Sequence, residues 1–358
     1  MQKGRLSGLD ALRGLAAIVV VLCHYTVGYS DVTGHPFHPS FTVPDGHYGV
    51  ELFFIISGFV IFMTLDRCPH PYDFVASRIS RLIPAFWTCM FLTATATVVL
   101  GLYWMPRLGV RSVVANMTMA PRLFGRPAID PSYWTLAYEL VFYVLAAIAF
   151  YGGGSRRTEL FCAVWLLLSL ASHLVGLEHI PERLNLLLAL EWAPFFVIGV
   201  MLYRIRHAGR TRARILVLGA ALAMCLFGPH WSFRPIHSVV FLGLIAVFTG
   251  LVWLGTMNGS PLARLLPLVF LGDISYSLYL IHQVIGFAVI ERATPLGLSA
   301  NVLVVVTTGL AVLLALAIGR VAEKPGQRLL RAVFARHRPR FVSKPRSPVE
   351  ARARPPAP

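Results

Sequence analysis

The chain has 358 residues, of which 56% are hydrophobic and only 13% are charged. These proportions exclude an ordinary soluble domain and indicate a protein that crosses a membrane many times. The formal net charge is +16, but the basic residues are scattered through short segments between apolar runs and in a C-terminal tail. They form no basic module with exposed aromatic side chains, so membrane topology explains the charge better than nucleic-acid binding does.

Ten apolar segments can be followed along the chain as candidate membrane spans. They lie near residues 9–29, 47–66, 82–102, 132–151, 159–177, 184–205, 214–228, 236–256, 267–290 and 299–320. The segment 214–228 is short, and 267–290 carries two ionisable groups. We therefore predict an all-α fold: a polytopic transmembrane bundle of about ten spans over residues 1–330, followed by a disordered, Arg- and Pro-rich basic tail over 331–358 that could lie against anionic membrane lipid.

The first apolar segment could be mistaken for a secretory signal peptide, because Lys3 and Arg5 precede it. It contains Asp10 and Arg13, however, and no small-residue cleavage site precedes His24. We therefore expect a retained first span.

The distribution of lysine and arginine among the loops favours cytoplasmic positions for both termini. This orientation leaves four arginines outside between the third and fourth spans, and an interfacial helix near residues 107–119 would account for some of them.

Arg13 and His24 stand at the two ends of an apolar run and are eleven positions apart. In a helix, eleven residues turn through about 1100° and advance by about 16 Å, so both side chains would share one face. Buried polar groups are costly unless they are partnered, which favours a function for the pair. The alternative is an arginine and a histidine that anchor the two ends of a span at the membrane interfaces.

Further polar residues interrupt other apolar segments, and each has a structural alternative to a functional role. Glu51 lies near one end of the second span, and Glu139 lies within the fourth, where a carboxylate needs a partner. Ser275, Tyr279 and His282 recur at spacings of four and three on one helical face, as expected for chemistry or for hydrogen bonding between helices.

Arg78 and Arg81 lie in SRISRLIP, with Pro84 expected in the first turn of the third span. Such a cationic pair suits phosphate binding, or it anchors the span on the cytoplasmic side. A histidine that can act as a general base, an acidic residue and a cationic pair together suit group transfer. The five cysteines show no metal-ligand spacing, so no metal is expected.

The sequence resembles the membrane-bound acyltransferase-3 family over about residues 8 to 325. The resemblance rests on six blocks in the same order, represented here by Arg13 and His24; Glu51, Ser57 and Gly58; Arg78 and Arg81; Trp134, Thr135 and Glu139; Ser275, Tyr276, Tyr279 and His282; and Glu323 with Pro325. Lys324 stands where arginine is common in the family, and the charge is retained.

The resemblance implies an O-acyltransferase of the bacterial cytoplasmic (inner) membrane that moves an acetyl group from cytoplasmic acetyl-CoA to a hydroxyl of a cell-surface or lipid-linked glycan. His24 would be the general base or would assist acyl movement, and Arg13 would orient the donor or oppose charge on the thioester oxygen. Glu139 would fix His24 or a shared water, and Arg78 with Arg81 would contact coenzyme A phosphates. Substrate-binding or supporting roles would fall to Glu51, Ser57, Trp134, Ser275, Tyr276 and His282.

A second hypothesis is a proton-coupled transporter of a small or glycosylated solute, in which Arg13, His24 and Glu139 would relay protons. Matched Gly- or Pro-broken segments in two inverted halves would favour it, and none is evident. A scaffold role in glycan export would leave the membrane carboxylates unexplained.

Overall fold

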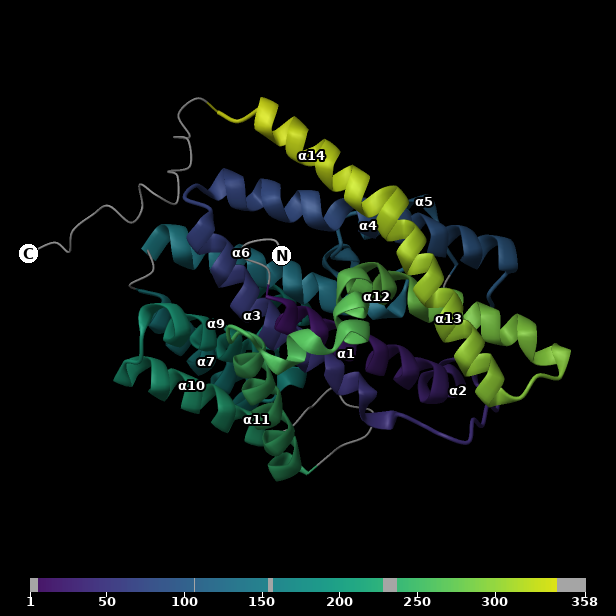
Figure 1. Cartoon of the computed structure of the whole chain (residues 1–358), viewed down its shortest axis with the longest axis horizontal. Coiled ribbons are helices and arrows are strands. Elements are labelled where there is room, and N and C mark those ends of the chain that lie inside the picture. The colour runs from purple at the N-terminus through teal and green to yellow at the C-terminus, as the bar shows by residue number, and fades with distance from the viewer. Residues whose placement is uncertain (1–5, 106, 154–156, 228–236, 340–358) are drawn as a thin grey trace, which may run out of the picture.

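The structure is a computed structural model that describes residues 6–105, 107–153, 157–227 and 237–339. Within these ranges all regular secondary structure is helical (Figure 1). The helices are α1 (Ser7–Cys23), α2 (Tyr29–Thr33), α3 (Gly49–Arg67), α4 (Pro71–Leu100), α5 (Val110–Asn116), α6 (Trp134–Gly153), α7 (Thr158–Val175), α8 (Glu182–Leu188), α9 (Ala193–Ala208), α10 (Arg212–Met224), α11 (Ser238–Gly255), α12 (Leu266–Ala293), α13 (Ala300–Ile318) and α14 (Lys324–Arg336). A π-helical turn (His24–Gly28) joins α1 to α2. The all-helical fold predicted from the sequence is confirmed.

Nine helical segments in the described residues are long and apolar enough to cross a membrane. The seventh of the ten predicted spans, 214–228, corresponds to α10, which has only 13 residues. At one end of α10, Arg214 Nε lies 2.6 Å from Oε1 of Glu159, near the start of α7. Just beyond the other end, the Phe227 ring lies 5.6 Å from the ring of His173, near the end of α7. Thus α10 and its following turn run along α7, but α10 is too short to count among the nine candidate spans.

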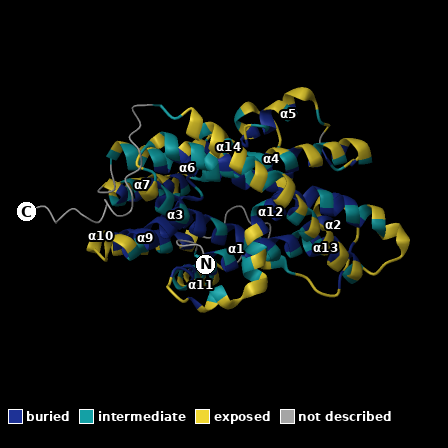
Figure 2. Cartoon of the chain, turned by 45° about the horizontal axis from the view of Figure 1, so that its top comes forward, coloured by how far each residue is buried: buried dark blue, intermediate teal, exposed yellow. Residues whose placement is uncertain are grey.

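The centre of the bundle is formed by α1, α3, α9 and α12, and Figure 2 shows the buried residues concentrated on α1, α3 and α9. Two glycines bring α1 and α12 into backbone contact. A Cβ atom on Gly14 would lie 2.0 Å from the carbonyl oxygen of Leu268, and one on Gly272 would lie 2.0 Å from that of Asp10. Small residues allow such close helix packing in membranes, where van der Waals contact stabilises association. This contact fixes the face of α1 that carries Arg13 against α12.

The third span begins much earlier than residue 82, because α4 starts at Pro71. His70 accepts a hydrogen bond from the backbone N–H of Tyr72 and caps the helix, and proline is favoured in a first turn. The expectation that Pro84 would lie in the first turn is therefore wrong, since it lies inside the helix. Asp73, Arg78 and Arg81 lower the hydropathy of the first turns of α4, so hydropathy alone does not indicate that these turns belong to the span. As a result, Arg78 and Arg81 are held on a rigid helix.

The chain continues beyond α13 through a second π-helical turn (Gly319–Glu323) into α14, which lies along α4 (Figure 1). Tyr72 Oη donates to the carbonyl oxygen of Phe334 at 2.9 Å, and Arg338 pairs with Asp73 at 2.7 Å. Residues 331–336 of the predicted tail are thus the last turns of a helix, and residues 340–358 lie outside the described ranges.

Candidate active site

Two adjoining cavities lie inside the bundle, and the predicted residues divide between them. The first, here called the Arg13 cavity, is narrow, with a volume of about 60 Å³. Its polar lining includes residues of five helices, α1, α3, α4, α6 and α12: Arg13, Ser57, Arg78, Arg81, Glu139, Tyr143, Ser275 and Tyr276. The second, the His24 cavity, has a volume of about 970 Å³. Its size is that of a typical small-molecule site, whereas the first admits only a slender group.

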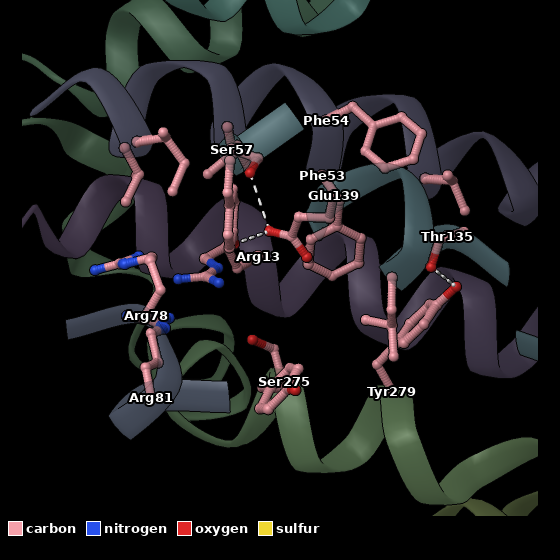
Figure 3. A pocket seen from close by; sticks show the side chains of 17 residues that line it. Arg13, Phe53, Phe54, Ser57, Arg78, Arg81, Thr135, Glu139, Ser275 and Tyr279 are labelled. Atoms are coloured by element: carbon pink, nitrogen blue, oxygen red, sulfur yellow. Dashed lines mark hydrogen bonds between the residues drawn. The ribbon is translucent and has the colours of Figure 1, made fainter. Parts of the chain in front are cut away.

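Three guanidinium groups gather at one end of the Arg13 cavity, as Figure 3 shows. Arg13 comes from α1, and Arg78 and Arg81 come from α4. The Nε atom of Arg13 has no hydrogen-bond partner within the described part of the chain. The cavity's one acidic lining residue is Glu139, so its lining carries an excess of positive charge suited to an anionic ligand.

Glu139 accepts hydrogen bonds from Ser57 Oγ at 3.0 Å and from Tyr143 Oη at 2.5 Å, both at its Oε1 atom. From the family resemblance, Glu139 was expected to hold His24 or a shared water, but the structure places the two residues in different cavities. Glu139 lines the Arg13 cavity, whereas His24 lines the other one. The carboxylate is instead held beside the arginines.

The ring that contacts His24 belongs to His282 of α12. His24 Nδ1 lies 2.7 Å from His282 Nε2; the two ring planes differ by 6° and their centroids lie 5.0 Å apart, so the rings meet edge to edge through these nitrogens. Sequence reasoning found both residues but missed their contact, because 258 positions separate them. His24 also begins the π-helical turn, a departure from α-helix that often marks functional sites.

The His24 cavity combines aromatic and polar groups. The rings of Trp134 and Trp192 lie 5.1 Å apart, and Tyr138 lies 5.9 Å from Trp192. Its polar lining includes Asp31, His47, Arg122, Arg126, Glu182, Glu191 and Gln283. Sequence reasoning selected Trp134 but missed Trp192, Glu191 and Gln283. The available signals were the EWAP segment at the start of α9 and the glutamine that directly follows His282.

The two cavities share Val50 of α3 and Tyr279 of α12 in their linings. Tyr279 Oη bonds with Thr135 Oγ1 at 2.8 Å, at the end of the Arg13 cavity away from the arginines (Figure 3). A group that extends past the arginines would therefore approach the His24 cavity at this junction.

Of the remaining predicted residues, Ser275 and Tyr276 hydrogen-bond to backbone carbonyls, and Glu51 lies apart from both cavities. Ser275 Oγ donates to the Gly272 carbonyl oxygen at 2.9 Å, and Tyr276 Oη donates to that of Leu82 at 3.2 Å. Glu51 is fully buried and lines neither cavity; its carboxylate oxygens have no hydrogen-bond partner among the described residues. No group of three or more His, Cys, Asp and Glu residues that could hold a metal ion is found in the described ranges.

Comparison with known proteins gives matches over most of the chain. Residues 6–320 match a family described as an acyltransferase domain. The chain is 29% identical over 315 residues to the exopolysaccharide production protein ExoZ of Rhizobium meliloti (strain 1021), covering 83% of this chain and 92% of that protein. It is 26% identical over 299 residues to a putative acetyltransferase, ORF330, of Acidianus two-tailed virus, covering 79% of this chain and 84% of that protein. No solved structure gives a significant match.

Proposed function

The chain belongs to the acyltransferase-3 family of multi-pass membrane enzymes, and we propose that it moves an acetyl group from acetyl-CoA to a hydroxyl group of a cell-surface or lipid-linked glycan. The observation that carries the proposal is the pair of adjoining cavities, one lined by three arginines and the other by His24 and aromatic rings. An acyltransferase needs two substrates to meet, and the shared residues Val50 and Tyr279 mark the meeting point.

The donor side is the Arg13 cavity. Arginine binds phosphate through charge-assisted and bidentate hydrogen bonds, so Arg78 and Arg81 suit the phosphates of coenzyme A. A volume of about 60 Å³ is too small for a nucleotide but suits the slender, unbranched cysteamine end of the pantetheine arm. The thioester would then point toward Val50 and Tyr279. Because Arg13 lines this cavity and not that of His24, its role is to orient the donor.

The acceptor side is the His24 cavity. Aromatic side chains give the flat apolar surfaces against which sugar rings pack, and carboxylate and amide groups suit their hydroxyls. Trp134, Tyr138 and Trp192 supply the aromatic surfaces, and Glu191 and Gln283 supply polar atoms. The Rhizobium relative is named for exopolysaccharide production. The proposed acceptor is therefore a glycan rather than an amine or a lipid.

The chemistry is a direct transfer from sulfur to oxygen. His24 takes the proton of the acceptor hydroxyl, and the oxygen attacks the thioester carbon. The carbon–sulfur bond breaks, and His24 returns the proton to the thiolate to give coenzyme A. The excess of basic residues at the Arg13 end of the bundle supports a cytoplasmic donor site, with both termini on that side of a bacterial inner membrane.

The donor assignment is tested with the purified full-length protein in lipid nanodiscs. We expect Arg78→Gln and Arg81→Gln each to weaken acetyl-CoA binding about tenfold or more, measured by isothermal titration calorimetry. Arg212→Gln is the matched control, because Arg212 is exposed at the start of α10. Equal affinities for all three variants would refute the donor site.

The acceptor assignment is tested in membrane vesicles of the native host. Vesicles that contain the wild-type protein should incorporate label into polysaccharide from acetyl-CoA that carries 14C in its acetyl group, and those with His24→Gln should lose about 100-fold or more of this activity. His173→Gln serves as the control, because His173 lies on α7 and lines neither cavity; its Nδ1 atom lies 2.7 Å from the carbonyl oxygen of Ser169 in the same helix. Label in another fraction would overturn the glycan acceptor, and full incorporation by His24→Gln would remove His24 from the chemistry.

A further inference from the structure

His282 is buried behind His24 and lines neither cavity, although it is an ionisable group inside the bundle. Its side chain has two contacts that define its hydrogen-bonding state. His282 Nδ1 lies 2.8 Å from the carbonyl oxygen of Tyr279, and His282 Nε2 lies 2.7 Å from His24 Nδ1. A carbonyl oxygen only accepts hydrogen bonds, so the proton of neutral His282 must lie on Nδ1.

The proton on His282 Nδ1 determines which ring nitrogen of His24 carries a proton. With Nδ1 protonated, His282 Nε2 carries a lone pair and is an acceptor, so His24 must donate from its Nδ1. Neutral His24 then has no proton on Nε2. An imidazolium at His282 would break this chain of hydrogen bonds. A buried charge needs an opposite charge, and the hydrogen-bond partners of this ring among the described residues are backbone carbonyls and the imidazole of His24. The order of donors therefore leaves the lone pair of His24 on Nε2.

The backbone of α12 around His282 is held in place by side chains from other segments. Tyr25 Oη donates to the His282 carbonyl oxygen at 2.8 Å, and Tyr133 Oη donates to that of Leu280 at 2.9 Å. Asp130 accepts a hydrogen bond from the Val284 N–H at 3.2 Å. These contacts hold the backbone of α12 at the position from which the imidazole of His282 reaches His24.

We infer that His282 is a positioning residue that sets the tautomer of His24 and presents its Nε2 lone pair as the base for the acceptor hydroxyl. The inference rests on the proposed function, because it assigns His24 as that base. When His24 takes the hydroxyl proton on Nε2, it becomes an imidazolium. The lone pair on His282 Nε2 continues to accept the Nδ1 hydrogen bond and stabilises this cation. The proton then passes from His24 Nε2 to the departing thiolate, so His282 itself gains and loses none.

Two substitutions at His282 separate hydrogen bonding from packing. His282→Gln keeps an acceptor about as far from the backbone as Nε2 and a donor for the Tyr279 carbonyl, whereas His282→Met keeps similar volume with only a weak acceptor. In native-host vesicles we expect His282→Gln to keep acetyl incorporation within about tenfold of the wild type. His282→Met should lose about 100-fold or more in maximal rate, with an unchanged KM for acetyl-CoA.

The matched control is His173→Met, since His173 Nδ1 also bonds a carbonyl oxygen of its own helix, at 2.7 Å. Equal activity of His282→Gln and His282→Met would overturn the inference, because packing alone would then explain the residue. Retained acetyl-CoA binding by His282→Met excludes misfolding as the cause of its lost rate.

A direct readout is available without substitution at His282. In full-length protein labelled with 15N-histidine, NMR should show His24 with a protonated Nδ1 and an unprotonated Nε2, assigned by loss of the signal in His24→Gln. A proton on Nε2 of neutral His24 would contradict the inference even if His24 proves essential. Full activity of His24→Gln, in contrast, would contradict the proposed function itself.

Discussion

Tyr279 Oη lies 2.8 Å from Thr135 Oγ1 at the junction of the two cavities. The same oxygen lies 3.0 Å from the carbonyl oxygen of Ser132, so this side chain of α12 is tied to the segment that enters α6. Val50 of α3 is the other residue common to both cavities. Tyr279 and Val50 line both cavities, so position 50 is the place to test whether the cavities form one reaction path.

Val50→Phe should block the junction without touching the arginines. The larger ring adds volume at a side chain that is only 6% exposed, in a place where both cavities end. We expect acetyl incorporation in vesicles to fall at least about tenfold, while acetyl-CoA binding changes by less than about threefold. Val50→Ala is the matched control and should keep incorporation. Equal activity of the two variants would show that the acyl group does not pass Val50.

The elements of the bundle could be predicted from hydropathy because each long span is an apolar run, and the Arg13 to His24 spacing correctly places both residues on α1 and the turn that follows it. The start of α4 could not be predicted, since Asp73, Arg78 and Arg81 make its first turns polar. Charged residues at a helix end are tolerated where they lie outside the hydrocarbon region, so hydropathy alone reports the apolar part of a longer helix.

Contacts between site residues on different helices could not be predicted from the sequence, for a different reason. Helical spacing relates residues within one helix, such as Ser275, Tyr279 and His282, but the distance from His24 to His282 depends on how α1 packs on α12. That packing depends on backbone contact at Gly14 and Gly272. A single sequence shows the glycines but not which helix packs against them. The sequence therefore does not show that Glu139 lines a cavity with Arg13 and not with His24.

Gly286→Ala should weaken the hydrogen bond from Tyr25 to the backbone of His282. A Cβ atom at this position would lie 2.2 Å from Tyr25 Oη, the hydroxyl that bonds the His282 carbonyl oxygen. Displacing Tyr25 in a packed interior should cost about 1–3 kcal/mol of folding free energy. We expect a lower midpoint of thermal unfolding in detergent together with lower acetyl incorporation. Gly309→Ala on α13, with nothing within 4 Å of its Cβ position, should leave both unchanged. Wild-type behaviour of Gly286→Ala would mean that Tyr25 does not hold His282 in place.

Asp130 should make stability depend on pH. It lies just before the Pro131–Gly153 span, and its burial raises its pKa from an ordinary 3.8 to about 6, against the lowering effect of hydrogen bonds from Ser132 and Val284. A carboxyl group with a raised pKa binds its proton more tightly in the folded state. Its stabilising contribution is therefore complete below about pH 4 and is lost as the pH rises to about 6; it amounts to about 3 kcal/mol at most.

Asp130→Asn removes this titration. We expect the thermal midpoint of the wild type, measured relative to that of Asp130→Asn, to fall between pH 4 and 6 and to stay constant above pH 7. Parallel curves for the two proteins across this range would show that Asp130 titrates alike in the folded and unfolded states.

Gln283→Leu should weaken use of the acceptor and not of the donor. Gln283 follows His282 on α12, lines the His24 cavity and is 5% exposed; its Oε1 atom has no hydrogen-bond partner within the described residues. When a sugar hydroxyl binds in the cavity, the Oε1 atom of Gln283 can accept a hydrogen bond from it. Such a bond contributes about 0.5–1.5 kcal/mol, or up to about tenfold in rate. Leucine has similar volume and no acceptor. We expect acetyl incorporation to fall by up to about tenfold while the KM for acetyl-CoA stays at its wild-type value. A raised KM for acetyl-CoA with normal maximal incorporation would instead place Gln283 on the donor side of the junction.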